Sequence, residues 1–159
     1  MQLVADAIAW KSQIDILVSN PALTHHADFL EFDIDRFEQI IQSTLISGFV
    51  MSQQIAKQMV KQQTGGKIIF ISSVHAEMPV ARSIAYGAAK AGLNHMAETM
   101  AVELARHHIN VNVIEPGWID TPGERTLFTE EYIQEQAGKL PLGRLGTPDD
   151  IGSTVFFLL

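Results

Sequence analysis

Tyr86 and Lys90 lie four residues apart in the segment Tyr-Gly-Ala-Ala-Lys. On an α-helix this spacing places the phenol and the ammonium group on one face, one turn apart. A free tyrosine has a pKa near ~10, so it is a poor base at neutral pH unless a nearby positive charge stabilises the phenolate. Lys90 can supply that charge, which makes the pair a candidate for general acid–base catalysis. Taken alone, the spacing also fits an ordinary surface pair.

The surroundings of this pair favour chemistry. Three apolar runs each end in polar or turn-forming residues: Ser19 and Asn20 at the end of 14–19, Ser72 and Ser73 at the end of 67–72, and the segment 115–122 after 109–114. If the runs are parallel strands, these ends meet at one edge of the sheet, where sheets of this class bind ligands. Singly, Asn20 with Pro21 fits a turn, and Pro116 with Gly117 fits a strand end. Jointly, they indicate a site.

The elements that would position these residues alternate along the chain. The apolar runs are rich in Ile and Val, which is typical of strands buried on both faces of a parallel sheet. Apolar residues recur at helical spacing over 33–63 and 85–107. The first helix is expected to end at Thr64, Gly65 and Gly66, where glycine can take the left-handed conformation. This order predicts an α/β fold in three layers, a Rossmann-like, doubly wound parallel sheet.

The chain is interpreted as a single partial catalytic domain over residues 1–159, with a flap at about 118–146. The flap is polar and irregular around a short helical stretch near 129–137. A final helix is predicted after it, with Thr147 as its cap and Pro148 at its first position. Both ends look truncated, because one face of the sheet has too little to cover it. Either a partner chain or further residues are expected there.

Composition excludes several classes of function. The net charge of −7 and the scattered basic residues argue against nucleic acid as a partner. No cysteine is present, which excludes disulfides and thiolate metal sites. The adjacent histidines at 25–26 and 107–108 are interpreted as solvated, and no metal is predicted. No membrane-spanning segment is expected, and the cytoplasm is the default location.

Four segments together resemble successive signatures of the classical short-chain dehydrogenases/reductases. These are D-I-L-V-S-N-P-A, K-I-I-F-I-S-S-V, Y-G-A-A-K-A-G-L and I-N-V-N-V-I-E-P-G-W-I-D-T-P, in the order and spacing of that family. The resemblance covers about residues 15–159. Within the family, the chain is most similar to bacterial 3-oxoacyl-carrier-protein reductases and glucose 1-dehydrogenases.

The resemblance implies an NAD or NADP cofactor and hydride transfer between nicotinamide and a small-molecule carbonyl or secondary alcohol. It implies that Tyr86 transfers a proton, that Ser73 holds the substrate oxygen, and that Lys90 stabilises the phenolate and binds the nicotinamide ribose. It also implies a homo-oligomer formed through the two long helices. The residues expected at the cofactor are Asn20, Tyr86, Lys90, Pro116, Gly117, Ile119 and Thr121.

The sequence also departs from the family pattern. No glycine occurs before Gly48, so the phosphate-binding segment T-G-x-x-x-G-x-G, which would precede the first strand, is not found in these residues. Pro21 stands where the family usually has an alanine, and it fixes the backbone beside the cofactor path. Thr44 matches the position of an asparagine that helps to hold a relay water, and a hydroxyl offers a weaker relay.

Two classes of function therefore remain open at this point. The first is an oxidoreductase, with epimerase or dehydratase chemistry on the same scaffold as a related alternative. The second is a non-catalytic, dimerising fragment derived from the family, because hydride transfer needs a positioned cofactor.

Overall fold

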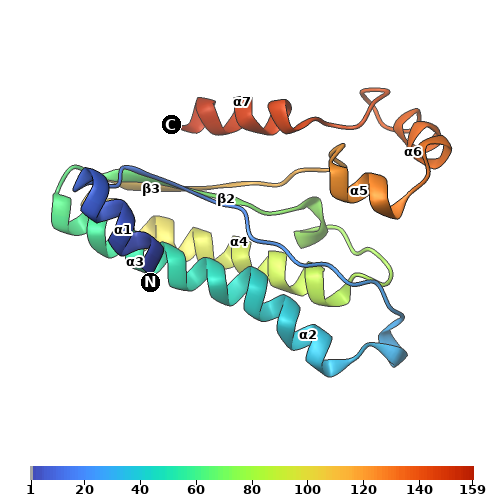
Figure 1. Cartoon of the computed structure of the whole chain (residues 1–159), viewed down its shortest axis with the longest axis horizontal. Helices are drawn as coiled ribbons and strands as arrows, with labels where there is room; N and C mark the ends of the chain where they lie inside the picture. The colour runs from blue at the N-terminus through green and yellow to red at the C-terminus, as the bar shows by residue number, and fades with distance from the viewer. Residues whose placement is uncertain (1) are drawn as a thin grey trace.

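The computed structural model describes residues 2–159, and its centre is a three-stranded parallel sheet (Figure 1). The strands β1 (Ile16–Ser19), β2 (Gly66–Ile71) and β3 (Ile109–Ile114) lie side by side in chain order. Val18 is paired with Ile69, and Ile69 with Asn112. The predicted parallel α/β sheet is confirmed, and its three carboxyl ends lie at one edge.

Helices cover both faces of the sheet, which gives three layers. In Figure 1, α3 and α4 lie on one face of the sheet and α7 lies on the other. The α-helices are α1 (Gln2–Lys11), α2 (Ile34–Ile41), α3 (Ser47–Gln62), α4 (Ile84–Leu104), α5 (Pro122–Leu127), α6 (Glu130–Ala137) and α7 (Pro148–Leu158). Three short 3-10 turns are η1 (Phe29–Glu31), η3 (Val74–Ala76) and η4 (Ala105–His107).

Strand β2 shows why the apolar runs do not alternate. Ile68 and Phe70 belong to the core cluster on the side of α3 and α4. Ile69 and Ile71 belong to a separate cluster, against which residues of α7 pack. Both faces of β2 are therefore covered by apolar side chains, as expected for a central parallel strand.

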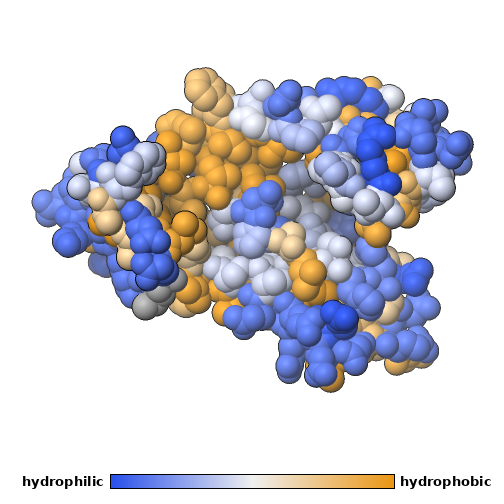
Figure 2. Space-filling model, in the orientation of Figure 1, coloured by the Kyte–Doolittle hydropathy of each residue, from blue (hydrophilic) through white to orange (hydrophobic). Residues whose placement is uncertain are grey.

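Cover on the α7 face is incomplete. Ile16 and Val18 of β1 remain 46% and 43% exposed, and Phe156 and Phe157 of α7 point outward at 80% and 84% exposure. Figure 2 shows an apolar area over α7 and the adjoining sheet. The expected shortage of cover is therefore found at β1, whereas α7 shields β2 and β3.

The long helix predicted over 33–63 is continuous in space but not uniform. Its middle is a π-helical turn, Gln42–Ile46, between α2 and α3. Buried positions recur every four residues, at Ile40, Thr44, Gly48 and Ser52. An α-helix has 3.6 residues per turn, so such a stripe drifts by about 40° at each step. The wider π turn takes up part of that drift and keeps the stripe facing inward.

Two features of this region differ from the prediction. The residue that ends α3 in the left-handed conformation is Gln63, with φ 59°, rather than a glycine. Gly65 is also left-handed, at φ 76°, and a Cβ there would lie 2.6 Å from the carbonyl oxygen of His108. Glycine is thus required at 65 for a close backbone approach, not for ending the helix.

Helices α1 and α5 lie outside the elements predicted from sequence, while α7 begins as predicted. Thr147 and Asp150 form a reciprocal capping box ahead of α7, with Pro148 in its first turn. The part of the chain that the structure describes holds no helix long and apolar enough to cross a membrane.

Candidate active site at the carboxyl edge of the sheet

The predicted catalytic residues meet where β2 ends and α4 begins. Ser73 follows β2 and caps η3, accepting a hydrogen bond from the His75 backbone N–H at 3.2 Å. Tyr86 lies in the first turn of α4, and Lys90 lies one turn later. The structure therefore brings Ser73, Tyr86 and Lys90 together, although their roles stay predictions.

Lys90 is the most confined of the three, with only 1% of its surface exposed. Its Nζ donates a hydrogen bond of 2.7 Å to the Ile71 carbonyl oxygen at the end of β2. The same Nζ lies 5.6 Å from the centre of the Tyr86 ring. Burial lowers the pKa of Lys90 to about 8, because an ammonium group loses its hydration there.

The surroundings of Tyr86 favour the protonated form of its phenol. Its pKa is raised, chiefly by burial; a hydrogen bond with the Ser73 side chain opposes the rise, and the negative charge of Glu124 adds to it. Lys90 turns its Nζ to the Ile71 carbonyl oxygen, and its expected effect on the pKa of Tyr86 stays a prediction. The phenol consequently keeps its proton at neutral pH.

The segments expected at the cofactor lie along the same edge. Asn20 is exposed directly after β1. Pro116 accepts a backbone hydrogen bond from Val74 at 3.1 Å, and a Cβ built on Gly117 would meet nothing within 4 Å. Ile119 forms an isolated bridge to Gly146, while Thr121 caps α5.

The edge is open at Gly117, which leaves room for the nicotinamide end of a dinucleotide that is expected there. Residues 2–159 hold no comparable binding site for the phosphates of the dinucleotide. The connections that leave this edge of the sheet are 20–33, 72–83 and 115–121, and Gly117 is the sole glycine in them. A glycine-rich phosphate cradle is therefore not among the described connections.

Sequence reasoning missed His75, which lies beside Tyr86. The two rings meet edge to face, with centroids 5.4 Å apart and planes at 85°. His75 Nδ1 is buried without a hydrogen-bond partner in the described chain. Burial lowers the pKa of His75, His26 lowers it further, and Glu124 opposes both effects. The sequence did contain one signal for His75, which is its position two residues after Ser73 in the turn that follows a strand.

Sequence reasoning also gave no role to His26 or Glu124. His26 is exposed, as expected, and its Nδ1 lies 3.2 Å from Ser83 Oγ, just ahead of α4. Glu124 comes from α5, which the sequence analysis treated as irregular flap. No cluster of His, Asp and Glu suited to a metal ion occurs among residues 2–159.

Thr44 occupies the π turn, fully buried. Its Oγ1 has no hydrogen-bond partner within the described residues. A buried hydroxyl without a partner costs about 1–3 kcal/mol, so a bound water is the simplest partner. The position is compatible with the relay role expected from the resemblance, and that role stays a prediction.

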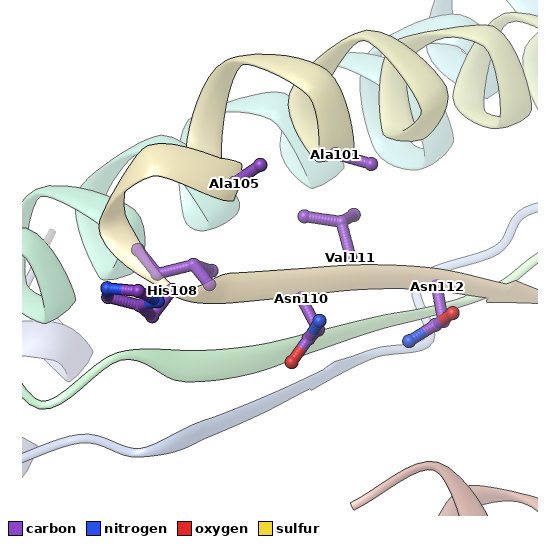
Figure 3. Close-up of a pocket in the computed structure, with 7 residues that line it drawn as sticks. Ala101, Ala105, His108, Asn110, Val111 and Asn112 are labelled. Atoms are coloured by element: carbon purple, nitrogen blue, oxygen red, sulfur yellow. The ribbon is translucent and has the colours of Figure 1, made fainter.

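A separate recess lies away from this site. A recess of about 300 Å³ follows the outer edge of β3 near its amino end, beside the last turns of α4 (Figure 3). Val111 points toward α4, whereas Asn110 and Asn112 point to the opposite side of the strand. Asn110 already accepts a hydrogen bond from Lys67 Nζ at 2.9 Å. This recess contains none of the predicted site residues.

Comparison with known proteins agrees with this geometry. A family model described as enoyl-(acyl carrier protein) reductase matches residues 1–159. The "uncharacterized oxidoreductase YohF" of Escherichia coli is 38% identical over 146 residues, which cover 92% of this chain and 57% of that protein. The 2-dehydro-3-deoxy-D-gluconate 5-dehydrogenase of the same organism is 37% identical over 98% of this chain and 62% of its own length.

Solved structures give the same result. Acetoin dehydrogenase from Enterobacter cloacae superposes with a TM-score of 0.87 at 34% identity, covering 99% of this chain and 61% of that one. A short-chain type dehydrogenase/reductase from Mycobacterium marinum superposes with a TM-score of 0.91 at 30% identity, covering 99% and 62%. The chain thus spans about three fifths of the length of these relatives.

Proposed function

The chain belongs to the short-chain dehydrogenase/reductase family, and we propose on this premise that it carries the acid–base machinery of an NAD(P)-dependent oxidoreductase. The reaction is reduction of a carbonyl group, or oxidation of the corresponding secondary alcohol. The observation that carries the proposal is the buried Lys90, whose Nζ lies 5.6 Å from the centre of the Tyr86 ring, with Ser73 following β2 at the same edge of the sheet.

Each residue has a distinct role in this reaction. A bound nicotinamide supplies the hydride for reduction, and Asn20, Lys90 and the segment 116–121 would hold its nicotinamide end. Tyr86 donates its phenolic proton to the substrate oxygen while Ser73 Oγ donates a hydrogen bond to the same oxygen. Lys90, charged below a pKa of about 8, offsets the negative charge left on the phenolate.

The names of the relatives support this class of reaction but not one substrate. They include an acetoacetyl-CoA reductase, a 3-oxoacyl-[acyl-carrier-protein] reductase, an L-rhamnose 1-dehydrogenase and an acetoin dehydrogenase. A carbonyl or secondary alcohol is the group we therefore propose for this chain.

Cofactor binding tests the proposal directly. We expect NADH or NADPH to bind saturably to the purified chain, and more weakly to Lys90→Ala, because the lysine is proposed to contact the nicotinamide ribose. Fluorescence titration of the nicotinamide measures both constants, with circular dichroism to show that each protein is folded. Equal binding by the two proteins, or no binding by a folded chain, would contradict the assignment of Lys90.

We also propose that copies of the chain associate through the two long helices. Phe49 and Val50 of α3 and Val102 of α4 are 46%, 43% and 80% exposed, so both long helices present apolar side chains at the surface. Phe49→Glu is expected to shift the molecular mass toward that of a monomer in light scattering. An unchanged mass in that variant would argue for a different interface.

A further inference from the structure

A second recess, of about 250 Å³, lies between α4 and β3, toward the carboxyl end of the strand. It continues the recess of Figure 3, because Ala101 and Val111 line both. Together with Ala97 and Val113 they give the second recess an apolar wall. Strand β3 is the last strand of the three-stranded sheet, so no strand among residues 2–159 covers this edge. An alkyl chain can therefore pack in the recess.

Three carboxylates from three different elements line the same recess. Glu77 follows η3, Glu98 lies on α4, and Glu115 follows β3. All three residues are exposed. Like charges around one recess repel one another and attract a cation. The recess thus joins an apolar wall to a negatively charged rim.

No basic side chain neutralises this rim. Within the part of the chain that the structure describes, no Lys or Arg forms a salt bridge with Glu77, Glu98 or Glu115. Glu98 meets the His95 ring at 3.5 Å, and this contact is an ion pair only when the imidazole is protonated. The two side chains are 74% and 85% exposed, so their contact is weakly stabilising at most.

Asn94 provides an observation that is independent of the charges. This residue of α4 lines the recess and is only 8% exposed. Its Nδ2 donates a hydrogen bond to Glu115 Oε1. Its Oδ1 is buried and has no hydrogen-bond partner within residues 2–159. Buried polar atoms are nearly always paired, so this amide oxygen calls for a donor, and an N–H group of a bound ligand would supply one.

The arrangement of the acceptors selects among cations. No group of His, Asp and Glu among the described residues is suited to a metal ion, so a bare metal ion does not fit. The acceptors come from both walls of the recess, which favours a ligand whose donors point in several directions. A guanidinium group carries five N–H donors in a planar fork, whereas an ammonium group is a compact charge with three.

We propose that this recess binds an alkylguanidinium group, which belongs either to an arginine side chain or to a small guanidine. The guanidinium donates hydrogen bonds to the carboxylates of Glu98 and Glu115 and to Asn94 Oδ1. The alkyl chain packs on the apolar wall, as the stem of an arginine does on a protein surface. None of Ser73, Tyr86 and Lys90 lines this recess, so binding requires neither the cofactor nor turnover.

Butylguanidinium titrated into the purified chain, followed by heteronuclear NMR, tests the proposal. We expect saturable shifts at the side-chain amide of Asn94 and at the backbone N–H groups of Ala97 and Ala101, and weaker binding as sodium chloride is raised. Butylurea has a similar shape without the charge and should not saturate these signals. Equal binding of butylurea, or no saturable shift at Asn94, would overturn the proposal. Calcium chloride that shifts the same signals at lower concentration would point to a metal site instead.

Two variants assign the binding to the rim. Glu98→Gln and Glu115→Gln should each weaken butylguanidinium binding about threefold, and the double variant about tenfold, because one charge is lost at each position. Glu103→Gln removes an exposed carboxylate of α4 that lines neither recess, and binding should stay at the parent value. Circular dichroism shows that each variant is folded. Parent-like binding by the folded double variant, or an equal loss in Glu103→Gln, would contradict the assignment.

The source of the guanidinium is distinguished by a second ligand. N-acetylarginine amide presents the same group on a peptide backbone and is titrated beside butylguanidinium. Tighter binding of the blocked arginine would identify an arginine side chain of a polypeptide as the ligand. Tighter binding of butylguanidinium would identify a small guanidine. Binding of neither by the folded parent chain would refute the site.

Discussion

Tyr86→Phe is expected to lower kcat/KM for carbonyl reduction by roughly 10²–10⁴-fold, because the variant lacks the proton that the substrate oxygen receives. The ring remains, so its edge-to-face contact with His75 and its packing near Ile40 and Ala89 are kept. The free energy of unfolding should therefore change little. Oxidation of NADH or NADPH, followed by absorbance with the substrate present, measures the effect.

The chain provides a matched control in its other tyrosine. Tyr132 lies on α6 and is 43% exposed. Removing its hydroxyl in Tyr132→Phe deletes the same atom from the flap, and turnover should stay close to that of the parent chain. Similar losses in the two variants, or none in either, would contradict the acid role of Tyr86.

Lys90→Met is expected to remove turnover and yet to stabilise the fold at pH 7. Lys90 is only 1% exposed, and burial disfavours the charged form of its ammonium group. Its pKa is therefore lowered from the usual 10.5 to about 8. Each pKa unit corresponds to about 1.4 kcal/mol. Methionine fills a similar space without a charge, which stabilises the fold. Loss of the hydrogen bond to Ile71 offsets part of this stabilisation. We expect a net increase of about 1–2 kcal/mol in the free energy of unfolding.

The stability advantage of Lys90→Met should depend on pH, which a difference in packing alone would not produce. The folded chain binds fewer protons at Lys90 than the unfolded chain between about pH 8 and pH 10.5, so this residue makes the parent more stable as pH rises through that window. The advantage of Lys90→Met should therefore shrink from pH 7 to pH 10. Urea unfolding at both values measures it.

An exposed lysine serves as the control for Lys90. Lys57 lies on the surface of α3, and Lys57→Met should change the stability by less than about 0.5 kcal/mol at either pH. A Lys90→Met protein that is less stable than the parent at pH 7 would mean that the hydrogen bond to Ile71 outweighs the cost of burying the charge.

The parts of the fold that sequence could predict are those governed by local pattern. Strand β3 has the predicted bounds, and β2 is shifted by one residue, because apolar runs flanked by turn residues fix a buried parallel strand. The conjunction of Ser73, Tyr86 and Lys90 followed from helix spacing and from the rule that strand ends share an edge.

The parts that sequence did not give depend on tertiary contacts. Val4 is the one buried residue of helix α1, so the sequence of α1 shows only a weak helical pattern of apolar residues. Helix α5 did leave a signal, since Thr121 and Pro122 repeat the cap of α7, but its six residues lie inside an irregular stretch. The position of His75 beside Tyr86 depends on how η3 packs against α4, which no spacing rule encodes.

The π turn at Gln42–Ile46 has a consequence for reading related sequences. A wide turn holds one more residue than the α-helical turn it replaces, so it can arise or vanish through a single insertion or deletion. Loss of that one residue would restore an α-helical turn and leave the residues after it, such as Ile55 and Met59, facing the core. In an alignment, relatives without the wide turn should therefore show a one-residue gap at this place, with the apolar positions of the following helix unchanged.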